Sequence, residues 1–475
     1  MKRHQIAVVG AGAAGLVVAF GAASAGIDVA LIEAERLGGE CTWTGCVPSK
    51  TLIDAARRAH EAKWSGHIGI SASDVTVDFP ALMRHIHETS AHVAEEEGLE
   101  RARRAGITVY QSFARFEDPH TLILDRGEQI RAKRIVLATG GRPRVPPPLR
   151  SVRHLTSETI WDLAELPEHL AVVGGGAAGT ELAQAFRRLG SRVTIITDVD
   201  RLLPAAHPDA SRSISEQLGV EGITIHTNTN VVSAVEGDDE LRLAIEDGTV
   251  ITASHVLVTI GRDVALRSMN PESAGIELDE SGAPVLDDRL RTNLGHIYVC
   301  GDATGAGLTH IASSQGAAVL LNIVSPRTFA ADTGVPRSAI FTDPEIAQVG
   351  LTKHEAMGRG LDIRVTRIPI SRVDRASVVG ASNGFLEAVH SRTGKLWGVT
   401  IVGPQAAEWA NQWIEPVTKN RRLAELVFVP TIYPTMGSSN AVVGYEWGEE
   451  MLGRGLLGRV VRIAGRLRMR VARYR

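Results

Sequence analysis

The stretch IAVVGAGAAG, residues 6 to 15, has the pattern of a buried strand, a glycine-rich turn and the start of a helix. Gly10 allows a sharp turn, Gly12 lets a pyrophosphate approach the backbone, and Gly15 lets the helix pack on the strand. The N-terminus of the helix then faces the phosphate charge. A second apolar run ends at Glu33, 23 residues after Gly10, where a carboxylate can accept hydrogen bonds from an adenosine ribose. The sequence therefore predicts a dinucleotide-binding unit.

The same pattern recurs as LAVVGGGAAG, residues 170 to 179. Its glycines at the matching positions are Gly174, Gly176 and Gly179. After the next strand, residues 192 to 196, Thr197 stands where the first copy has Glu33, and Asp198 follows it. The nearby cation that could contact a 2′-phosphate is Arg201, three residues too late. This second copy predicts a second dinucleotide site and favours NADH over NADPH.

Three further strands, residues 134–138, 255–260 and 297–300, each run into a glycine turn. The first two echo each other, and each lies where the chain would leave one nucleotide domain. The third leads to Asp302, a carboxylate that can hydrogen-bond a polyol. Two dinucleotide sites in one chain imply two redox partners that exchange hydride or electrons.

Two cysteines, Cys41 and Cys46, lie in GGECTWTGCVPSK, residues 38 to 50. Five residues of a regular helix rise about 7.5 Å, which exceeds the roughly 7 Å that a disulfide allows between α-carbons. A bridge therefore needs a distorted turn, which Gly45 permits, and Pro48 suits the first turn of the helix that follows. A thiol near that helix start has increased thiolate character. Zinc is disfavoured because no second ligand pair is nearby, which leaves a redox-active disulfide or a pair of unreactive thiols.

Composition limits the class of protein. The chain has 475 residues, 44% of them apolar, which suggests two to four domains. Three cysteines are too few for a secreted disulfide framework. A net charge of −3 disfavours nucleic-acid binding. With no signal-peptide pattern and no apolar run of about 18 residues, we expect a cytoplasmic protein.

Taken together, these motifs resemble the pyridine nucleotide-disulfide oxidoreductases, a family that includes dihydrolipoamide dehydrogenase, glutathione reductase and mercuric reductase. The resemblance extends to about residue 450 and also includes ATGG (138–141), VCGDATG (299–305) and FTDPEIAQVGLT (341–352). It implies an α/β protein with two Rossmann-like domains, for FAD and NAD(P), and a C-terminal α+β dimerisation domain of a homodimer. The implied boundaries are 1–150 and 266–330 for the FAD-binding parts, 151–265 for NAD(P) and 335–450 for dimerisation. Residues 451–475 form a basic tail that departs from the family pattern.

The resemblance also implies roles for individual residues. Cys46 would be the thiolate nearer the flavin and Cys41 the thiol that attacks the substrate, while Lys50 and Glu181 would form an ion pair beside the flavin N5. Taken alone, Lys50 and Glu181 are typical of solvated helix residues. The residues implied to bind the two nucleotides are Gly10, Gly12, Gly15, Glu33, Gly39, Lys50, Thr139, Gly140, Arg262, Gly301, Asp302, Gly174, Gly176, Gly179, Glu181, Asp198 and Gly261.

The family pattern breaks near the C-terminus. Disulfide reductases of this family carry His-Pro-Thr-x-x-Glu there, whereas this chain has Tyr433 in place of the histidine and Ser438 in place of the glutamate. A tyrosine is a poor base at neutral pH, so a disulfide substrate should turn over slowly. Mercuric reductases of the family also have a tyrosine at this point, but this sequence lacks their N-terminal Cys-x-x-Cys domain and their C-terminal vicinal cysteines.

We therefore expect an enzyme similar to mercuric reductase that holds no resident metal. Cys41 and Cys46 would bind a soft metal ion only transiently, as substrate. The alternative acceptors are a quinone or oxygen, and the alternative activities are that of dihydrolipoamide dehydrogenase or of a flavin-binding sensor or scaffold. Three other side chains are expected to be structural: Cys300 in a core strand, His310 as a satisfied histidine, and Trp409 with Trp413 at the dimer interface.

The tail after Glu450 contains eight arginines and no acid, which leaves −11 on residues 1–450. On one continuous helix, an apolar stripe would lie beside an arginine stripe. The apolar positions are Leu452, Leu456, Val460, Ile463, Leu467, Val471 and Tyr474, and the basic ones are Arg459, Arg462, Arg466, Arg470 and Arg473. Such a helix could contact an anionic membrane or an acidic partner. Four glycines weaken it, so disorder or packing within the chain are the alternatives.

Overall fold

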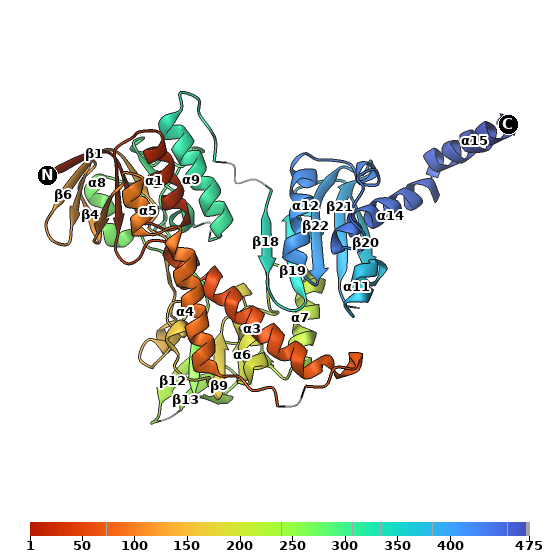
Figure 1. Cartoon of the computed structure of the whole chain (residues 1–475), viewed down its shortest axis with the longest axis horizontal. Coiled ribbons are helices and arrows are strands. Elements are labelled where there is room, and N and C mark those ends of the chain that lie inside the picture. Colours follow the sequence, from red (N-terminus) through yellow and green to blue (C-terminus); the bar gives the residue numbers. More distant parts are fainter. Residues whose placement is uncertain are drawn as a thin grey trace. The chain divides into compact units, whose positions relative to one another are not determined.

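The computed structural model describes residues 1–72, 74–238, 240–305, 307–331, 335–381, 383–453 and 455–471. The chain divides into two compact units, Met1–Asp200 with Glu221–Thr333 and Arg201–Val220 with Gly334–Arg475. Figure 1 labels their elements. Short 3₁₀ helices occur at Ser65–Ile68, Pro147–Leu149, Ile160–Asp162, Arg267–Met269, Gly301–Thr304, Ile370–Arg372 and Met436–Ser438.

The first domain of the first unit is built on a sheet with the strand order β3-β2-β1-β6-β5-β4, to which β17 adds beside β6. Its strands are β1 (Lys2–Val9), β2 (Val29–Glu33), β3 (Thr108–Gln111), β4 (Ala114–Asp118), β5 (Thr121–Leu124), β6 (Gln129–Leu137) and β17 (Ile297–Val299). β1 pairs in parallel with β2 and β6. Because β1 is central, both faces of its C-terminal half are buried, which explains the unbroken apolar run IAVV.

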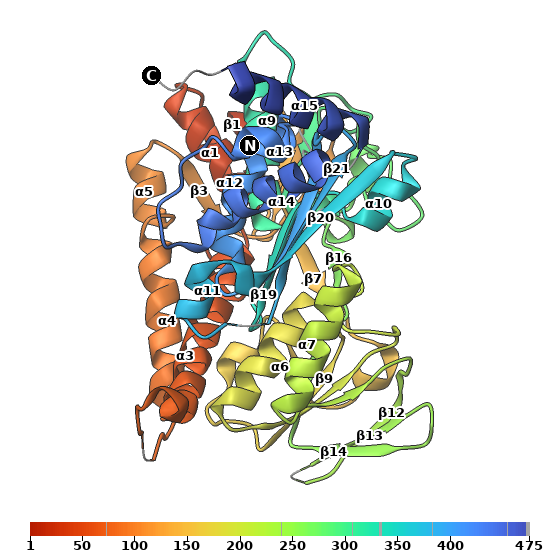
Figure 2. The ribbon, with the colours of Figure 1, turned by 90° about the vertical axis from the view of Figure 1, so that its right-hand side faces the viewer.

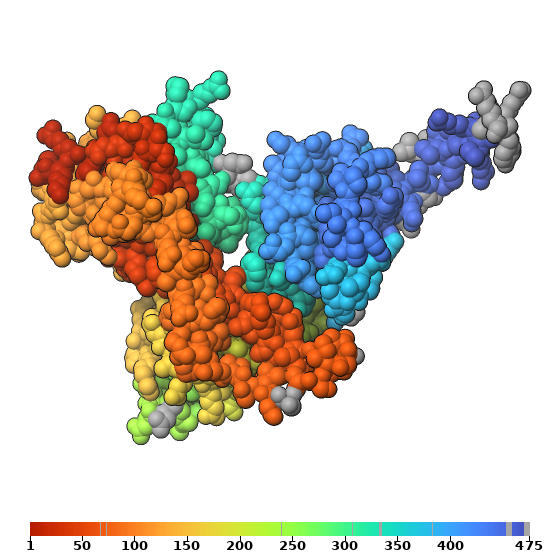
Figure 3. All heavy atoms as spheres, in the orientation of Figure 1, coloured from red at the N-terminus to blue at the C-terminus, as the bar shows by residue number. Residues whose placement is uncertain are grey.

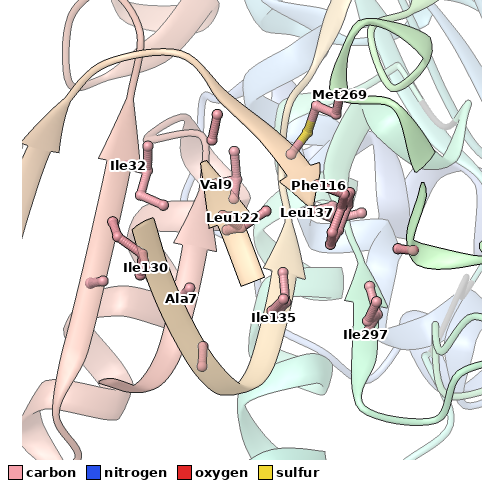
Figure 4. Close-up of a cluster of buried hydrophobic side chains, with 14 of the residues drawn as sticks. Ala7, Val9, Ile32, Phe116, Leu122, Ile130, Ile135, Leu137, Met269 and Ile297 are labelled. Carbon is pink, nitrogen blue, oxygen red and sulfur yellow. The ribbon is translucent and has the colours of Figure 1, made fainter. Parts of the chain in front are cut away.

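The core of this domain joins distant parts of the chain. Ala7 and Val9 of β1 pack with Ile135 of β6 and with Ile297 of β17 (Figure 4). The pairing of β17 with β6 is parallel, so the segment after residue 266 returns to the sheet that the N-terminus began. This return places the strand before Asp302 beside the strand before Thr139.

Helices cover this sheet and extend from it. They are α1 (Ala13–Ser24), α2 (Gly39–Trp43), α3 (Cys46–Trp64), α4 (Phe79–Glu95), α5 (Leu99–Arg104), α8 (Pro271–Ala274) and α9 (Thr309–Val324). α1 and α9 pack closely at Gly316, where an added Cβ would lie 2.6 Å from the Ala14 carbonyl oxygen. α3 and α4 lie side by side in both ribbon views (Figures 1 and 2).

The second domain of the same unit has a parallel sheet of order β11-β10-β9-β15-β8. Its strands are β8 (Leu155–Thr156), β9 (His169–Val173), β10 (Arg192–Ile196), β11 (Thr224–His226) and β15 (His255–Val258), and α6 (Ala177–Leu189) follows β9. An antiparallel sheet is formed by β12 (Val231–Glu236), β13 (Leu241–Ile245) and β14 (Val250–Ala253). The chain enters and leaves this domain through β7 (Gly141–Pro143) and β16 (Arg262–Val264), which pair with each other.

The second unit contains an antiparallel sheet of order β18-β19-β22-β21-β20. Its strands are β18 (Arg337–Ile340), β19 (Glu345–Gly350), β20 (Ile363–Pro369), β21 (Phe385–Ser391) and β22 (Leu396–Gly403). Its helices are α7 (Pro208–Val220), α10 (Lys353–Gly358), α11 (Asp374–Val378), α12 (Ala406–Thr418), α13 (Leu423–Leu426), α14 (Ser439–Gly453) and α15 (Gly455–Val471).

Two features of this unit differ from the sequence-based expectations. Helix α7 falls in the predicted NAD(P) domain but groups with the second unit, because His207 bonds Glu387 at 3.2 Å and Asp209 pairs with Arg367. The expected interface position of Trp409 and Trp413 is wrong. Both pack in the core of a single chain, and Trp413 is fully buried there.

The C-terminal segment is helical, as the sequence suggested, but it is not one helix. Leu452 belongs to α14, which ends at Gly453, whereas Val460, Ile463 and Leu467 belong to α15. The glycines explain this division. Arg454, Arg473, Tyr474 and Arg475 lie outside the described residues, as do the side chains of Leu456, Arg470 and Val471. Among the described residues, no helix is long and apolar enough to cross a membrane.

Candidate active site

The first glycine motif brings three backbone segments into close contact. A Cβ on Gly10 would lie 2.2 Å from the Ala138 carbonyl oxygen, and one on Gly15 would lie 1.9 Å from the Gly10 carbonyl oxygen. Gly39, at φ +64°, is so near Gly12 that its Cβ would come within 2.6 Å of the Gly12 α-carbon. Gly10, Gly15 and Gly39 therefore have no room for side chains, and α1 begins after Gly12, which provides no side-chain cap. The N–H groups of its first turn are available to a phosphate.

Glu33 lies at the end of β2 beside this turn. Its Oε2 accepts a hydrogen bond from the Ala11 N–H at 2.7 Å, and its Oε1 accepts one from the Glu35 N–H at 2.8 Å. Burial raises the pKa of Glu33, and these backbone bonds oppose the rise. The two bonds fix the orientation of the carboxylate, which could accept hydrogen bonds from an adenosine ribose.

Asp302 follows β17 and is held near α1 by its neighbour. Gly301 has φ +72°, its Cβ would lie 3.2 Å from the Ala14 Cβ, and its N–H donates to Gln315 Oε1 at 2.8 Å. Burial raises the pKa of Asp302, and the charge of Arg262 opposes this. Asp302, which follows the third strand, therefore lies beside the first glycine motif, where its carboxylate could contact a polyol.

A cluster of charges surrounds Arg262. Its Nη2 lies 2.9 Å from Glu40 Oε2 and 3.0 Å from Glu158 Oε1, and it donates to the Gly141 carbonyl oxygen. The pKa of Glu40 is raised to about 7, mainly because the carboxyl is buried, with Arg262 opposing. The sequence motifs did not single out Glu40, although its place between Gly39 and Cys41, in the segment of the thiol pair, was a usable signal.

The residues of this region fit a bound flavin nucleotide. Two buried polar atoms, Thr139 Oγ1 and Arg262 Nε, have no hydrogen-bond partner within the described part of the protein. A buried group left unpaired costs about 1–3 kcal/mol, so these atoms are suited to a polar ligand. Gly140 and Gly261 have φ values of +69° and +108°, and a Cβ on either would meet nothing within 4 Å. Together with the first glycine motif, Glu33 and Asp302, these atoms could hold a flavin nucleotide.

The two cysteines lie on separate helices. Cys41 is in the short α2 and Cys46 is the first residue of α3, with Gly45 between them at φ −113° and ψ −108°. The Gly45 N–H bonds the Glu40 carbonyl oxygen at 2.6 Å, and a Cβ on Gly45 would lie 3.3 Å from the Cys41 α-carbon. The helix is therefore interrupted where the spacing requires a distorted turn.

Cys41 and Cys46 are free thiols in the structure, and hydrogen bonding between their sulfurs is the first cause of the pKa shift of each. The pKa of Cys46 is lowered to about 6, first by the hydrogen bond from Cys41 and then by Thr309 and the charge of Lys50. The Cys46 sulfur lies 3.4 Å from Thr309 Oγ1. The same hydrogen bond and burial raise the pKa of Cys41. The two shifts therefore favour a reduced pair with its negative charge on Cys46 and its proton on Cys41.

Lys50 of α3 and Glu181 of α6 form an ion pair. Lys50 Nζ donates to Glu181 Oε2 at 2.7 Å, with the two side chains 34% and 6% exposed. A nearly buried carboxylate needs such a partner. The pair joins the helix that carries Cys46 to the helix of the second fingerprint, and neither residue is an ordinary solvated helix residue.

The second glycine motif, residues 174–179, which we call the second fingerprint, repeats the close backbone contacts of the first. A Cβ on Gly174 would lie 2.6 Å from the Thr259 carbonyl oxygen, and one on Gly179 would lie 2.2 Å from the Gly174 carbonyl oxygen. Gly176 faces open space. Asp198, beyond the end of β10, is exposed, whereas Arg201 Nη2 bonds the Pro204 carbonyl oxygen at 2.9 Å.

The remaining candidates differ in their surroundings. Tyr433 is 71% exposed, and its hydroxyl donates to Asp374 Oδ2 at 2.9 Å, which raises the pKa of Tyr433. Cys300 is fully buried and burial raises its pKa to about 12, as expected for a core thiol. His310 is exposed, and its neighbour Thr309 is the residue that contacts Cys46.

Comparison with known proteins identifies this arrangement of two nucleotide folds and a thiol pair. Residues 4–316 match the family model described as pyridine nucleotide-disulphide oxidoreductase, and residues 336–441 match its dimerisation domain. The chain belongs to this family. It is an FAD-dependent oxidoreductase of two Rossmann-like domains and a dimerisation domain, with FAD and NAD(P)H as its cofactors, and it forms a homodimer.

Similar proteins carry several names. A dihydrolipoyl dehydrogenase of Chlamydia pneumoniae is 33% identical over 458 residues, which is 95% of this chain and 97% of that one. A mercuric reductase of Bacillus cereus is 31% identical over 412 residues, 85% of this chain and 65% of that one. The Cu(II) complex of the HOCl-induced flavoprotein disulfide reductase RclA from Escherichia coli matches with a TM-score of 0.83 and 27% identity, covering 94% of this chain and 99% of that one. LpdA from Mycobacterium tuberculosis matches with a TM-score of 0.86 and 26% identity over the same shares.

Proposed function

We propose that this protein reduces thiophilic metal ions with electrons from NAD(P)H, and that Cys41 and Cys46 bind the ion as substrate. The main support for this proposal is that Tyr433 stands where the family pattern has its histidine base. Its hydroxyl is bonded to Asp374, and its raised pKa keeps it protonated at neutral pH. Thiol-disulfide exchange needs a base in this position, whereas reduction of a metal ion has no leaving thiolate to protonate.

The proposed step balances without an added base. Cys41 thiol, Cys46 thiolate and one Hg(II) ion give the Cys41–Cys46 disulfide, Hg(0) and one proton. With copper, two Cu(II) ions become two Cu(I) ions. In both cases the two sulfurs lose two electrons and the proton of Cys41 goes to solvent. The Cu(II) complex of RclA and the mercuric reductase relative support ions of this kind as acceptors.

The other site residues have proposed roles in returning the disulfide to the dithiol. When bound, FAD would carry two electrons from NAD(P)H to the disulfide. Glu33, Asp302, Arg262 and Thr139 would hold it together with the first fingerprint. The second fingerprint and Asp198 would hold the nicotinamide nucleotide, for which we favour NADH.

The Lys50–Glu181 pair would lie where the two nucleotides meet, since it links the helix of the thiol pair to that of the second fingerprint. Lys50 also stabilises the Cys46 thiolate through its charge. The cytoplasm is the proposed location, because reduced thiols persist there. For the basic C-terminal helix, an anionic membrane or an acidic protein are the proposed partners.

A panel of acceptors tests the proposal. NADH oxidation by the purified holoenzyme would be followed with Hg(II), Cu(II), lipoamide, a quinone and oxygen. We expect the metal ions to be reduced at least about 100-fold faster than lipoamide, the lower bound of what a positioned base contributes. Comparable turnover of lipoamide would instead establish a dihydrolipoamide dehydrogenase and contradict the proposal.

Stopped-flow addition of NADH tests the route of the electrons. We expect a long-wavelength absorbance band that is lost in Cys46→Ser, together with metal reduction, and kept in the matched control Cys300→Ala. Cys300 is a suitable control because its side chain is fully buried directly after strand β17. Flavin bleaching and acceptor turnover that persist in Cys46→Ser would contradict the thiol route, and failure of NADH to bleach the flavin would favour a sensor or scaffold.

A further inference from the structure

Helix α15 carries a concentrated positive charge. Within its described side chains, Arg459, Arg462, Arg466 and Arg468 occur in ten residues, and the sequence has no acid after Glu450. Arg462 Nη1 donates to the Leu452 carbonyl oxygen at 2.5 Å, so this arginine caps the C-terminal end of α14. Arg459, Arg466 and Arg468 have exposed side chains. Because residues 451–475 contain no aspartate or glutamate, no side chain on this helix can neutralise these three arginines.

An apolar stripe lies beside these arginines. Val460, Ile463 and Leu467 are spaced three and four residues apart, which puts them on one face of a helix. Their side chains are 53%, 58% and 56% exposed. Contiguous apolar side chains that are exposed normally mark a surface that binds a partner or a membrane. Figures 1 and 3 show α15 extending beyond the sheet of the second unit. The unit's own core therefore does not cover this stripe.

We propose that α15 docks this protein on an anionic membrane surface, with the Val460–Ile463–Leu467 stripe in the acyl boundary and the arginines on lipid phosphates. A lipid interface offers apolar and anionic layers side by side, which is the pairing that this helix presents. Arginine binds phosphate with two parallel hydrogen bonds. At about 1.5 Å per residue, the 17-residue helix spans about 25 Å and would lie in the plane of the surface.

The choice of lipid over an acidic protein rests on the apolar stripe. An acidic partner would satisfy the arginines but would leave three adjacent aliphatic side chains against polar surface. The inference does not depend on the electron acceptor, because α15 contains none of the residues proposed for chemistry. Membrane binding and metal reduction can therefore fail separately.

Sedimentation with vesicles tests the proposal on the full-length holoenzyme. We expect binding to vesicles of equimolar phosphatidylglycerol and phosphatidylcholine, weakened by salt, and no binding to pure phosphatidylcholine. Each arginine near an anionic surface is worth about fivefold in partitioning. Replacing Arg459, Arg466 and Arg468 with glutamine should therefore weaken binding about 100-fold, while lysine at the same three positions should retain it. Arg462 is left in place because it bonds α14.

Two further variants separate the alternatives. Ile463→Gln with Leu467→Gln keeps the charge, so loss of binding would support insertion of the stripe, whereas unchanged binding would reduce the contact to charge alone and overturn the proposal. A chain ending at Gly453 keeps α14 whole, and its NADH-dependent flavin bleaching checks that it is folded. Equal sedimentation of this chain and the full chain with anionic vesicles would refute the proposal. A change of oligomeric state without any lipid binding would do the same, because it would assign the stripe to a second copy.

Discussion

Replacing Cys41 with alanine should raise the pKa of Cys46, because the Cys41 thiol is the largest cause of its depression to about 6. A hydrogen bond to a charged group is worth about 1.5–3 kcal/mol, and about 1.4 kcal/mol corresponds to one pKa unit. The loss of this bond should therefore raise the pKa by about one to two units. Thr309 and Lys50 still favour the thiolate in the variant, so the pKa should remain below that of an ordinary thiol.

The assay is the rate of alkylation of the reduced protein against pH. In the wild type the rate should fall as the pH drops through about 6 and should be level above it, since the thiolate reacts and the thiol does not. Cys41 does not interfere with this titration because its pKa is raised, and Cys300 does not because its pKa is about 12 and its side chain is fully buried.

Cys300→Ala is the matched control and should leave the midpoint near 6. A wild-type midpoint near that of an ordinary thiol, about 8.5, would refute the asymmetric pair. An unchanged midpoint in Cys41→Ala would show that the hydrogen bond from Cys41 is not the cause.

Three other variants test the rest of the site. Lys50→Met should slow flavin reduction by NADH in stopped flow and lower the denaturant midpoint, because it removes the lysine charge from the nearly buried carboxylate of Glu181. Gly39→Ala should abolish retention of FAD, measured as flavin per chain after gel filtration, since φ is +64° and the new Cβ would meet backbone at 2.6 Å; Gly26→Ala, at φ +75° in open space, should keep its flavin. Tyr433→His should raise turnover of lipoamide at least about tenfold, because it restores a base, and unchanged turnover would show that the missing histidine is not what limits that substrate.

The backbone of the two nucleotide folds was predictable because their constraints are local. Gly10 and Gly174 have φ values of +100° and +121° and no room for a side chain, and such positions leave a mark in the sequence. The interrupted helix between Cys41 and Cys46 followed from the reach of a disulfide. The two glycine motifs and the turn could therefore be placed from spacing alone.

The electrostatic contacts of the site were not predictable in the same way. Thr309 reaches Cys46 from 263 residues away, and the segment that contains it gave no reason to prefer Thr309 over His310. Glu40 becomes a half-buried partner of Arg262 only when β16 returns to the first domain. Trp413 was expected at an interface because its helical spacing identifies an apolar face but not what covers that face. In each case the missing information is long-range packing.

The hydrogen bond between the two sulfurs also bears on the choice of acceptor. It lowers the pKa of Cys46 and raises that of Cys41, so the reduced pair keeps one proton on the thiol that a disulfide substrate would need as a nucleophile. Without a histidine at position 433, nothing proposed for this site removes that proton, and the attack should be slow. A thiophilic metal ion removes it directly, because metal binding to a thiol releases the proton. The asymmetry of the thiol pair therefore supports the proposal that the acceptor is a metal ion and not a disulfide.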